Sequence, residues 1–230
     1  MDRTKGFTPA LGFHVLTPLY DRVVAMTTRE RTFKQALLDQ AAIEPGQQVL
    51  DVGCGTGTLA ISAQRLVPGV RVSGLDADPA VLAIAARKAR DAGADIAFDL
   101  GPSSSLPYAD ERFDRVLSSL FFHHLSWGDK LLTAREMNRV LRPSGELHVA
   151  DWGRAGGLVS RTAFLAIQLL DGFDTTSDNV AGLLPVLFGS AGFRHVEETR
   201  RISTAFGIVS LYRAVKGGPA PGRQSDGGTA

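Results

Sequence analysis

Three alternating glycines follow a short apolar run that contains an acid, in the order Val49-Leu50-Asp51-Val52-Gly53-Cys54-Gly55-Thr56-Gly57. Because glycine tolerates positive φ and has no side chain, backbone N–H groups in such a bend can approach a ligand closely. Residues 58–63 are typical of the first turns of a helix, whose N-terminus carries unpaired donors. The pattern therefore indicates a strand–loop–helix nucleotide site. Its spacing differs from the dinucleotide fingerprint and from the P-loop, and a tight turn without a ligand is the alternative.

Asp76 ends the next apolar run, near the roughly 20-residue distance beyond the glycines at which an acid accepts hydrogen bonds from ribose hydroxyls. The alternative role is the N-cap of the following helix. Asp78 suits that role better, because Pro79 follows it and proline favours the first helical position. We therefore expect Asp76 to bind a ribose.

Composition excludes several classes of protein. The 230 residues carry a formal net charge of +1 without a basic run, so we expect no nucleic-acid partner and favour a small molecule. Cys54 is the single cysteine; it can form no intramolecular disulfide, and we expect it to fill space in the loop and to bind no metal. The chain shows no apolar run of roughly 18 residues and no secretory signal, which predicts a cytoplasmic protein without a membrane span.

Strand and helix patterns alternate along most of the chain. We expect strands at 49–52, 70–76, 95–99, 113–118 and 146–151, and helices at 29–42, 58–66, 79–92 and 129–141, with a turn at 142–145. This order predicts an α/β fold with a parallel sheet and helices on both faces. Ligands then bind beyond the carboxyl ends of the strands, where Asp51, Asp76, Ser119 and Asp151 would gather.

The last third departs from this alternation. We expect helices at 158–170 and 180–191, and then two β-rich runs, at 194–202 and 205–215, that form an antiparallel hairpin at the sheet edge. Residues 216–230 are rich in glycine and proline and are expected to be a disordered tail.

Four blocks in this order resemble the class I S-adenosylmethionine-dependent methyltransferases, especially the ubiquinone/menaquinone biosynthesis C-methyltransferases. They are residues 50–57, Gly74-Leu75-Asp76, Leu106-Pro107-Tyr108 with Phe113-Asp114, and residues 139–145, and together they cover about residues 45–152. The resemblance implies a single-domain Rossmann-like methyltransferase fold, with a mostly parallel seven-stranded sheet and an antiparallel C-terminal strand. Residues 1–44 would be a helical cap over the cofactor, 45–215 the core, and about 152–192 a helical insertion on the acceptor side.

The resemblance also implies S-adenosyl-L-methionine as the cofactor and S-adenosyl-L-homocysteine as the product. Asp51 would hold the loop and the cofactor's amino group, and Asp76 would bind the ribose. Further cofactor contacts would come from Tyr20, Gly53, Cys54, Gly55, Gly57, Ser119 and Leu120, and Ala77 would flank the adenine. Arg29 or Arg31 would meet the cofactor carboxylate, unless both are solvated charges.

One position departs from the family pattern. Four residues before Leu106, members usually carry an acid that bonds the adenine amino group, and this chain has Pro102. Adenine would then be read by the backbone and by Ser103 or Ser104, whose hydroxyls both donate and accept. This predicts looser selection of adenine. Ser144, where the family often has glycine, should matter little in a turn.

His123 and His124 follow the fourth strand, beside the expected sulfonium. Either imidazole is a candidate general base at neutral pH, with His124 preferred; capping or packing is the alternative. Asp151, with Trp152, could orient an acceptor or hold the loop that follows.

These features predict methyl transfer by in-line displacement to a small apolar or aromatic acceptor. Residues 158–170 with Phe121, Phe122, Trp152 and Phe173 would form an apolar wall, unless they are core or the face of a homodimer. A non-catalytic or cyclase-type protein that keeps the cofactor site is the first alternative. A nicotinamide-dependent oxidoreductase fits the glycine spacing, the 106–114 block and the hairpin less well.

Overall fold

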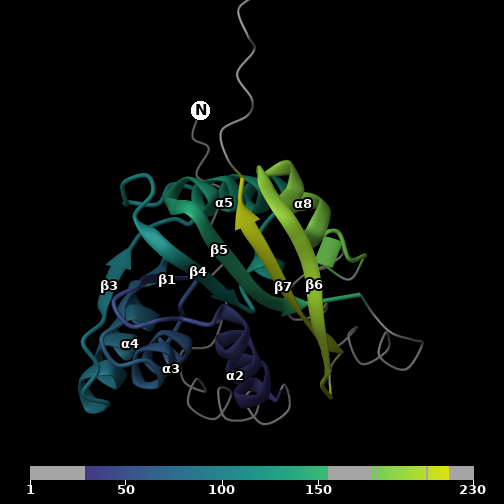
Figure 1. Cartoon of the computed structure of the whole chain (residues 1–230). Coiled ribbons are helices and arrows are strands. Elements are labelled where there is room, and N and C mark those ends of the chain that lie inside the picture. The colour runs from purple at the N-terminus through teal and green to yellow at the C-terminus, as the bar shows by residue number, and fades with distance from the viewer. Residues whose placement is uncertain (1–28, 155–177, 180, 206, 218–230) are drawn as a thin grey trace, which may run out of the picture.

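The computed structural model describes residues 29–154, 178–179, 181–205 and 207–217. One sheet of seven strands, in the order β3-β2-β1-β4-β5-β7-β6, runs through this part of the chain (Figure 1). The strands are β1 (Gln48–Val52), β2 (Arg71–Asp76), β3 (Ala97–Leu100), β4 (Phe113–Ser119), β5 (Leu141–Trp152), β6 (Phe193–Ser203) and β7 (Ile208–Lys216). The predictions for Tyr20, for residues 158–170 and Phe173, and for the tail from residue 218 onward lie outside the described residues.

Strand direction agrees with the predicted fold. β1 pairs in parallel with β2 and with β4, and β2 with β3 and β4 with β5 do the same. Among these seven strands, β7 alone runs antiparallel to its neighbours β5 and β6, as the expected hairpin requires. The strand order reverses between β1 and β4, so a ligand site is expected beyond the carboxyl ends of these two strands.

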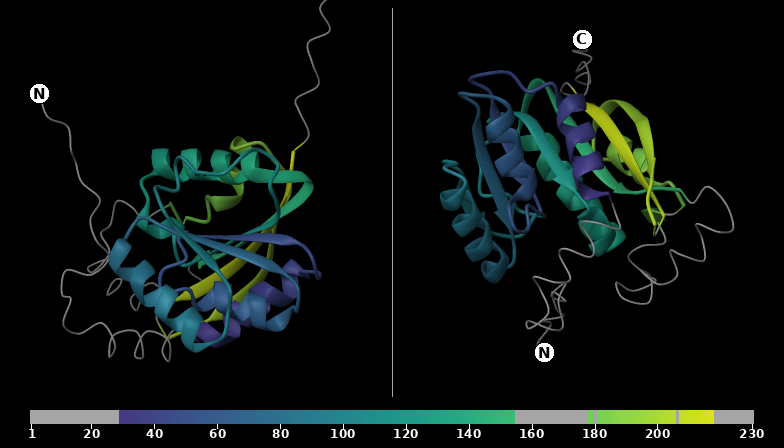
Figure 2. Two further views of the ribbon diagram at one scale, coloured as in Figure 1. Left: turned by 90° about the vertical axis from the view of Figure 1, so that its left-hand side faces the viewer. Right: turned by 90° about the horizontal axis from the view of Figure 1, so that it is seen from below.

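Helices cover both faces of the sheet, as Figure 2 shows. On one face lie α2 (Glu30–Ala41), α3 (Thr58–Leu66) and α4 (Pro79–Asp91); on the other lie α5 (Trp127–Val140) and α8 (Leu184–Ser190). Side chains on successive residues of a strand point to opposite faces. Val49 therefore joins the core under α2 and α3, whereas Leu50 and Val52 join the core under α5 and α8. Burial on both faces explains why Val49, Leu50 and Val52 are all apolar, with Asp51 as the buried acid among them.

Helix ends follow local chemistry. Asp78 caps α4 as predicted, because its Oδ1 accepts the backbone N–H of Ala80 at 2.8 Å. Ser126 caps α5, where its Oγ accepts the N–H of Asp129 at 3.2 Å, so this helix begins at Trp127, two residues before the predicted start. None of the helices among the described residues is long and apolar enough to cross a bilayer.

Two elements differ most from the sequence prediction. β5 begins at Leu141 because the expected turn at 142–145 is a bulge in the strand, with Ser144 at φ 64° and the register with β4 shifted across it. α8 begins at Leu184, not at residue 180. Gly182 has a φ of 76°, which interrupts a helix, and Pro185 favours a start at its first turn.

Candidate cofactor and acceptor site

The glycine loop is fastened to the end of β2. The backbone N–H groups of Gly53 and Cys54 donate to the carbonyl oxygen of Leu75 at 2.8 and 3.0 Å. Gly55 N–H donates to Asp76 Oδ2 at 2.8 Å, and Asp76 Oδ1 accepts the N–H of Asp78 at 3.0 Å. Asp76 therefore organises the loop and does not cap α4. Because each carboxylate oxygen can accept two hydrogen bonds, Asp76 keeps acceptor capacity for ribose hydroxyls.

Two glycines are needed for different reasons. A Cβ on Gly53 would lie 2.2 Å from Cδ2 of Phe121, so this glycine allows the Phe121 ring to pack on the loop. Gly55 has a φ of 52°, and a Cβ there would meet nothing within 4 Å. The backbone at Gly55 thus faces open space, as a loop that receives a ligand must.

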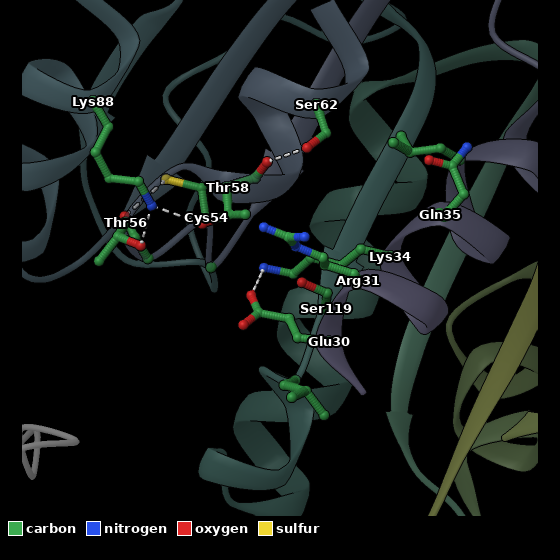
Figure 3. Close-up of a pocket in the computed structure, with 14 residues that line it drawn as sticks. Glu30, Arg31, Lys34, Gln35, Cys54, Thr56, Thr58, Ser62, Lys88 and Ser119 are labelled. Carbon is green, nitrogen blue, oxygen red and sulfur yellow. Dashed lines mark hydrogen bonds and ion pairs between the residues drawn. The ribbon is translucent and has the colours of Figure 1, made fainter. Parts of the chain in front are cut away.

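A cavity of about 690 Å³ opens above this loop, a size in the usual range for small-molecule sites. Figure 3 shows side chains from α2, the loop, α3 and α4 around it. Its lining comprises Glu30, Arg31, Lys34, Gln35, Leu38, Gly53, Cys54, Gly55, Thr56, Thr58, Ser62, Lys88, Ser119 and Leu120. The two candidate arginines separate here: Arg31 lines the cavity, whereas Arg29 donates to the carbonyl oxygen of Ser203 at 3.4 Å.

Two lysines of this lining were missed from the sequence. Lys34 forms an ion pair with Glu30 one helical turn earlier. The i, i+4 spacing of this pair, beside Arg31, is a sequence pattern from which the face of α2 that lines the cavity could have been predicted. Lys88 reaches from α4 to the loop, where its Nζ donates to Thr56 Oγ1 at 3.0 Å and to Thr58 Oγ1 at 2.8 Å (Figure 3). The local sequence does not predict the contact of Lys88 with Thr56 and Thr58, because that contact depends on how α4 packs against the glycine loop and α3.

Asp51 is the most unusual group near the loop. Its side chain is 1% exposed, and neither carboxylate oxygen has a hydrogen-bond partner among the described residues. Burial raises the pKa of Asp51 to about 7, although the charge of Lys34 opposes the change. A buried carboxylate without a partner is costly, and a ligand ammonium would supply the missing charge and donors. The residues present therefore fit an amino-acid-bearing cofactor.

Cys54 has no reactive character. Burial first, and the charge of Asp51 second, raise the pKa of its thiol, so the thiolate is disfavoured. Its Sγ lies in the core beneath the loop, where a Cβ on Gly74 would approach it to 3.0 Å. This agrees with a space-filling role.

Ser119 and Leu120 line the cavity at the end of β4. Leu120 has a φ of 50°, a left-handed conformation that is strained for a leucine, and its N–H donates to the carbonyl oxygen of Ala150 on β5 at 2.8 Å. Strain of this kind gathers at ligand sites. The bend turns the chain from β4 toward the two histidines.

The four residues predicted to lie near adenine do not line this cavity. Ser103 is buried, and its Oγ is 2.8 Å from Thr133 Oγ1, so its hydroxyl already has a partner within the protein. Pro102 is exposed, and its carbonyl oxygen accepts the N–H of Ser105 at 3.2 Å. Ala77 is exposed and Ser104 is half-buried. Their contact with adenine stays a prediction.

Asp151, at the end of β5, is as buried as Asp51 but has many partners. Its Oδ2 accepts the N–H groups of Phe121 and Phe122 at 3.0 and 2.7 Å. Its Oδ1 accepts His123 Nδ1 at 2.9 Å, Trp152 N–H at 2.7 Å and Asn179 Nδ2 at 3.0 Å. Burial alone would raise the pKa of Asp151, but the charge and hydrogen bond of His123 hold it below its usual range. Asp151 is therefore ionised and is a poor proton acceptor.

The two histidines differ in exposure. His123 is 3% exposed and is held by Asp151, whereas His124 is exposed to solvent. Their ring centroids are 3.9 Å apart. The charge of a protonated His123, followed by partial desolvation of the ring, lowers the pKa of His124. Because two imidazoles so close do not both carry a proton readily, His124 is neutral at physiological pH.

Known proteins resemble this chain in sequence. A family model described as a methyltransferase domain matches residues 49–145. The demethylmenaquinone methyltransferase of Deinococcus radiodurans is 31% identical over 214 residues, which cover 90% of this chain and 88% of that protein. Methyltransferase GfsG of Streptomyces halstedii is 36% identical over 150 residues; the chain spans about half the length of that relative, 51%, with 64% of its own residues.

Solved structures agree on the fold. A SAM-dependent methyltransferase from Aquifex aeolicus superimposes with a TM-score of 0.65 at 20% identity, and the match covers 87% of this chain and 96% of that one. The antiparallel strand β7 lies where the resemblance predicted it, and the glycine loop and Asp76 lie at the carboxyl ends of β1 and β2. This chain belongs to the S-adenosylmethionine-dependent methyltransferase family, together with the demethylmenaquinone methyltransferases.

Proposed function

We propose that this protein binds S-adenosylmethionine in the cavity above the glycine loop and transfers its methyl group to a small apolar or aromatic acceptor. The observation that carries the proposal is the pairing of an open, side-chain-free backbone at Gly55 with a buried carboxylate, Asp51, that lacks a partner among the described residues. Open space alone would suit many ligands. The unpartnered acid on β1, buried just before the loop and outside the cavity lining, calls for a cationic group that reaches it, and an amino-acid ammonium fits.

Each end of the cofactor has a candidate partner in the chain. Asp51 would accept from the ammonium, and Arg31, which lines the cavity, would donate to the carboxylate. Asp76 would accept from the ribose hydroxyls while it continues to hold Gly55 N–H. The glycine loop between these groups brings backbone donors close without the bulk of side chains.

When bound, S-adenosylmethionine supplies a methyl carbon that bonds to the acceptor as its bond to sulfur breaks, with the electron pair left on a neutral thioether. The protein's residues need not protonate this leaving group. Ser119, Leu120 and Phe121 form the edge of the site toward the acceptor, and their mainly apolar atoms would exclude water and align the acceptor. Positioning and removal of water then supply most of the rate.

A proton must leave when the attacking atom carries one. His124 is exposed and neutral, so a ring nitrogen would take up that proton only transiently and, because its pKa is lowered, release it at once to solvent. Asp151 would act as a positioning residue, since it is ionised and already accepts five hydrogen bonds. His123, held between Asp151 and His124, would orient the reactive ring.

An aromatic acceptor is favoured by two observations. The named relative from Deinococcus radiodurans is a demethylmenaquinone methyltransferase, and a naphthoquinone of that kind contains a fused aromatic ring. The partly buried ring of Phe121 packs on the glycine loop and offers an apolar surface there, whereas Phe122 and Trp152 belong to the core. A reduced demethylmenaquinone analogue with a short side chain is therefore the first acceptor to assay.

The test begins with calorimetric titration of S-adenosylhomocysteine. Gly55→Ala should abolish or strongly weaken binding, because its Cβ enters the cavity. Gly46→Ala is the matched control: Gly46 has a φ of 85° and equally open space, but it lies in the turn before β1, away from the cavity. Both variants should lose about 1–2 kcal/mol of stability from the left-handed alanine. Equal binding by wild type and Gly55→Ala would contradict the proposal.

Methyl transfer is tested with S-adenosylmethionine labelled in its methyl group. We expect label in the quinol analogue or in a related phenolic or apolar compound from a panel. If the product thioether binds but the label never leaves the cofactor, the protein is a non-catalytic or cyclase-type member that kept the site. If reduced nicotinamide cofactor binds and the thioether does not, the oxidoreductase alternative is right.

A further inference from the structure

Lys130 is a fully buried lysine on α5, with none of its side chain exposed. Its Nζ donates to Asn179 Oδ1 at 2.8 Å and lies 3.6 Å from Asp178 Oδ2. Burial lowers the pKa of Lys130, although Asp178 and Asp151 oppose the change. Burying an ammonium costs several kcal/mol unless partners compensate, so the neighbours of this lysine define its role.

Asn179 connects this lysine to Asp151. An ammonium can only donate, so the contact with Lys130 fixes which end of the amide is oxygen. The other end, Nδ2, must then point away from Lys130, and it donates to Asp151 Oδ1 at 3.0 Å. The result is one chain of buried hydrogen bonds, Lys130–Asn179–Asp151–His123, with donor–acceptor distances of 2.8, 3.0 and 2.9 Å.

We propose that Lys130 and Asn179 are positioning residues for methyl transfer, which keep Asp151 oriented as an acceptor and thereby fix the ring of His123 against His124. This inference rests on the proposed function, because it gives the two histidines their purpose. It concerns the acceptor side of the site: neither Lys130 nor Asn179 lines the cavity above the glycine loop.

The chain of hydrogen bonds ends at one atom, His123 Nδ1. Because the ionised Asp151 can only accept, His123 Nδ1 is the donor of this bond and carries a proton. Asp151 Oδ1 receives this bond together with those from Asn179 and Trp152 N–H. Without Asn179, Oδ1 keeps its backbone donor but loses the side chain that holds it from the far side. Asp151 Oδ1 is then held less firmly against His123 Nδ1, and the His123 ring gains freedom to move.

Asp151 Oδ2 contacts the cofactor side of the site, whereas Oδ1 contacts His123, so the two sides can be tested separately. It accepts the N–H groups of Phe121 and Phe122, and the Phe121 ring packs over Gly53 in the glycine loop. Changes at Lys130 or Asn179 act on Oδ1 and leave those backbone bonds in place. We therefore expect these changes to disturb His123 while cofactor binding is retained.

The experiment uses the full chain labelled with ¹⁵N-histidine. NMR spectra report which ring nitrogen of His123 is protonated and how fast the Nδ1 proton exchanges with solvent. Asn179→Ala and Lys130→Met should each speed this exchange about tenfold, the equivalent of one lost hydrogen bond of roughly 1.4 kcal/mol. Asn138→Ala is the control, because Asn138 lies on α5 and its Nδ2 has no hydrogen-bond partner among the described residues. That variant should match wild type.

Calorimetry with S-adenosylhomocysteine separates this inference from the proposed function. Retained affinity in both variants, with faster His123 exchange, supports the positioning role. The positioning role is overturned if a folded Asn179→Ala variant shows unchanged exchange of the His123 Nδ1 proton, whatever the result for Lys130→Met. It is also overturned if Asn179→Ala loses tenfold or more of its affinity for S-adenosylhomocysteine. If wild type itself fails to bind the thioether, the proposed function fails, while the His123 signals still decide whether the chain of hydrogen bonds operates.

Discussion

Asp51 makes cofactor affinity depend on pH. In the free protein the pKa of this carboxyl is raised by burial to about 7, whereas an ammonium bound beside it requires the ionised form. With a pKa of about 7, roughly one-tenth of Asp51 is ionised at pH 6 and about nine-tenths at pH 8. The dissociation constant for S-adenosylhomocysteine should therefore be about tenfold higher at pH 6 than at pH 8, which is about 1.4 kcal/mol.

The assay is calorimetry at pH 6, 7 and 8 in buffers of different ionisation enthalpy. At pH 6 binding should release about one proton, because Asp51 is protonated before binding and ionised after it. At pH 8 the release should be close to zero. Asp51→Asn should remove the proton release and weaken binding at pH 8 by about 1.5–3 kcal/mol, the usual contribution of a hydrogen bond to a charged group.

The control is Asp91→Asn, which changes an exposed acid at the end of α4 and should keep the wild-type pH profile. Histidines titrate in the same range, and only a difference between the two variants assigns the proton to Asp51. The reasoning is refuted if wild type binds the thioether equally well at pH 6 and pH 8 and releases no proton at either.

The same carboxyl should also affect stability. Its pKa is about 7 in the folded chain, against an ordinary value of 3.8 that applies once the chain unfolds, so between these values the folded state binds the extra proton. The free energy of unfolding of the ligand-free protein therefore falls as the pH rises from about 5 to about 7. Denaturant titration of Asp51→Asn should show a smaller fall, and an equal fall in the variant would argue against a buried, unpartnered acid.

Three further substitutions test the surroundings of the cavity. Arg31→Ala should weaken S-adenosylhomocysteine binding about three- to tenfold through loss of a charge-assisted contact, whereas Arg29→Ala, whose guanidinium bonds Ser203, should leave the calorimetric affinity unchanged. Lys88→Met removes donors to Thr56 and Thr58 and should reduce affinity by about 1 kcal/mol while thermal unfolding changes little. Ser126→Ala should cost about 1 kcal/mol of unfolding free energy through loss of the α5 cap, with unchanged affinity.

Local chemistry made much of the fold predictable. α3 begins at Thr58 as expected, because glycines end before it and helix formers follow. The β6–β7 hairpin and the Asp78 cap were also predicted from adjacent residues. The β5 bulge was missed because Ser144 takes a positive φ that its residue type does not announce. Such a conformation is imposed by pairing with β4, not by the segment itself.

The site residues that directly follow a strand were predictable from the sequence, whereas contacts between separate helices and loops were not. The glycine loop and Asp76 lie close in sequence to their own strands, and their contact through Gly55 N–H follows from the parallel pairing of β1 and β2. Lys88 and the Lys130–Asn179 contact depend on how α4 and α5 pack, and no spacing rule brings residues 130 and 179 together.

Asp51 and Asp151 show why position alone cannot assign function. Each acid is fully buried near the end of a parallel strand, and each follows apolar residues. Asp151 accepts five hydrogen bonds from the protein and its pKa is lowered; Asp51 has no partner among the described residues and its pKa is raised. Burial costs both carboxylates alike, and only partners offset that cost. The acid that the protein itself satisfies is built into the framework, and the one it leaves unsatisfied is the one that a ligand should complete.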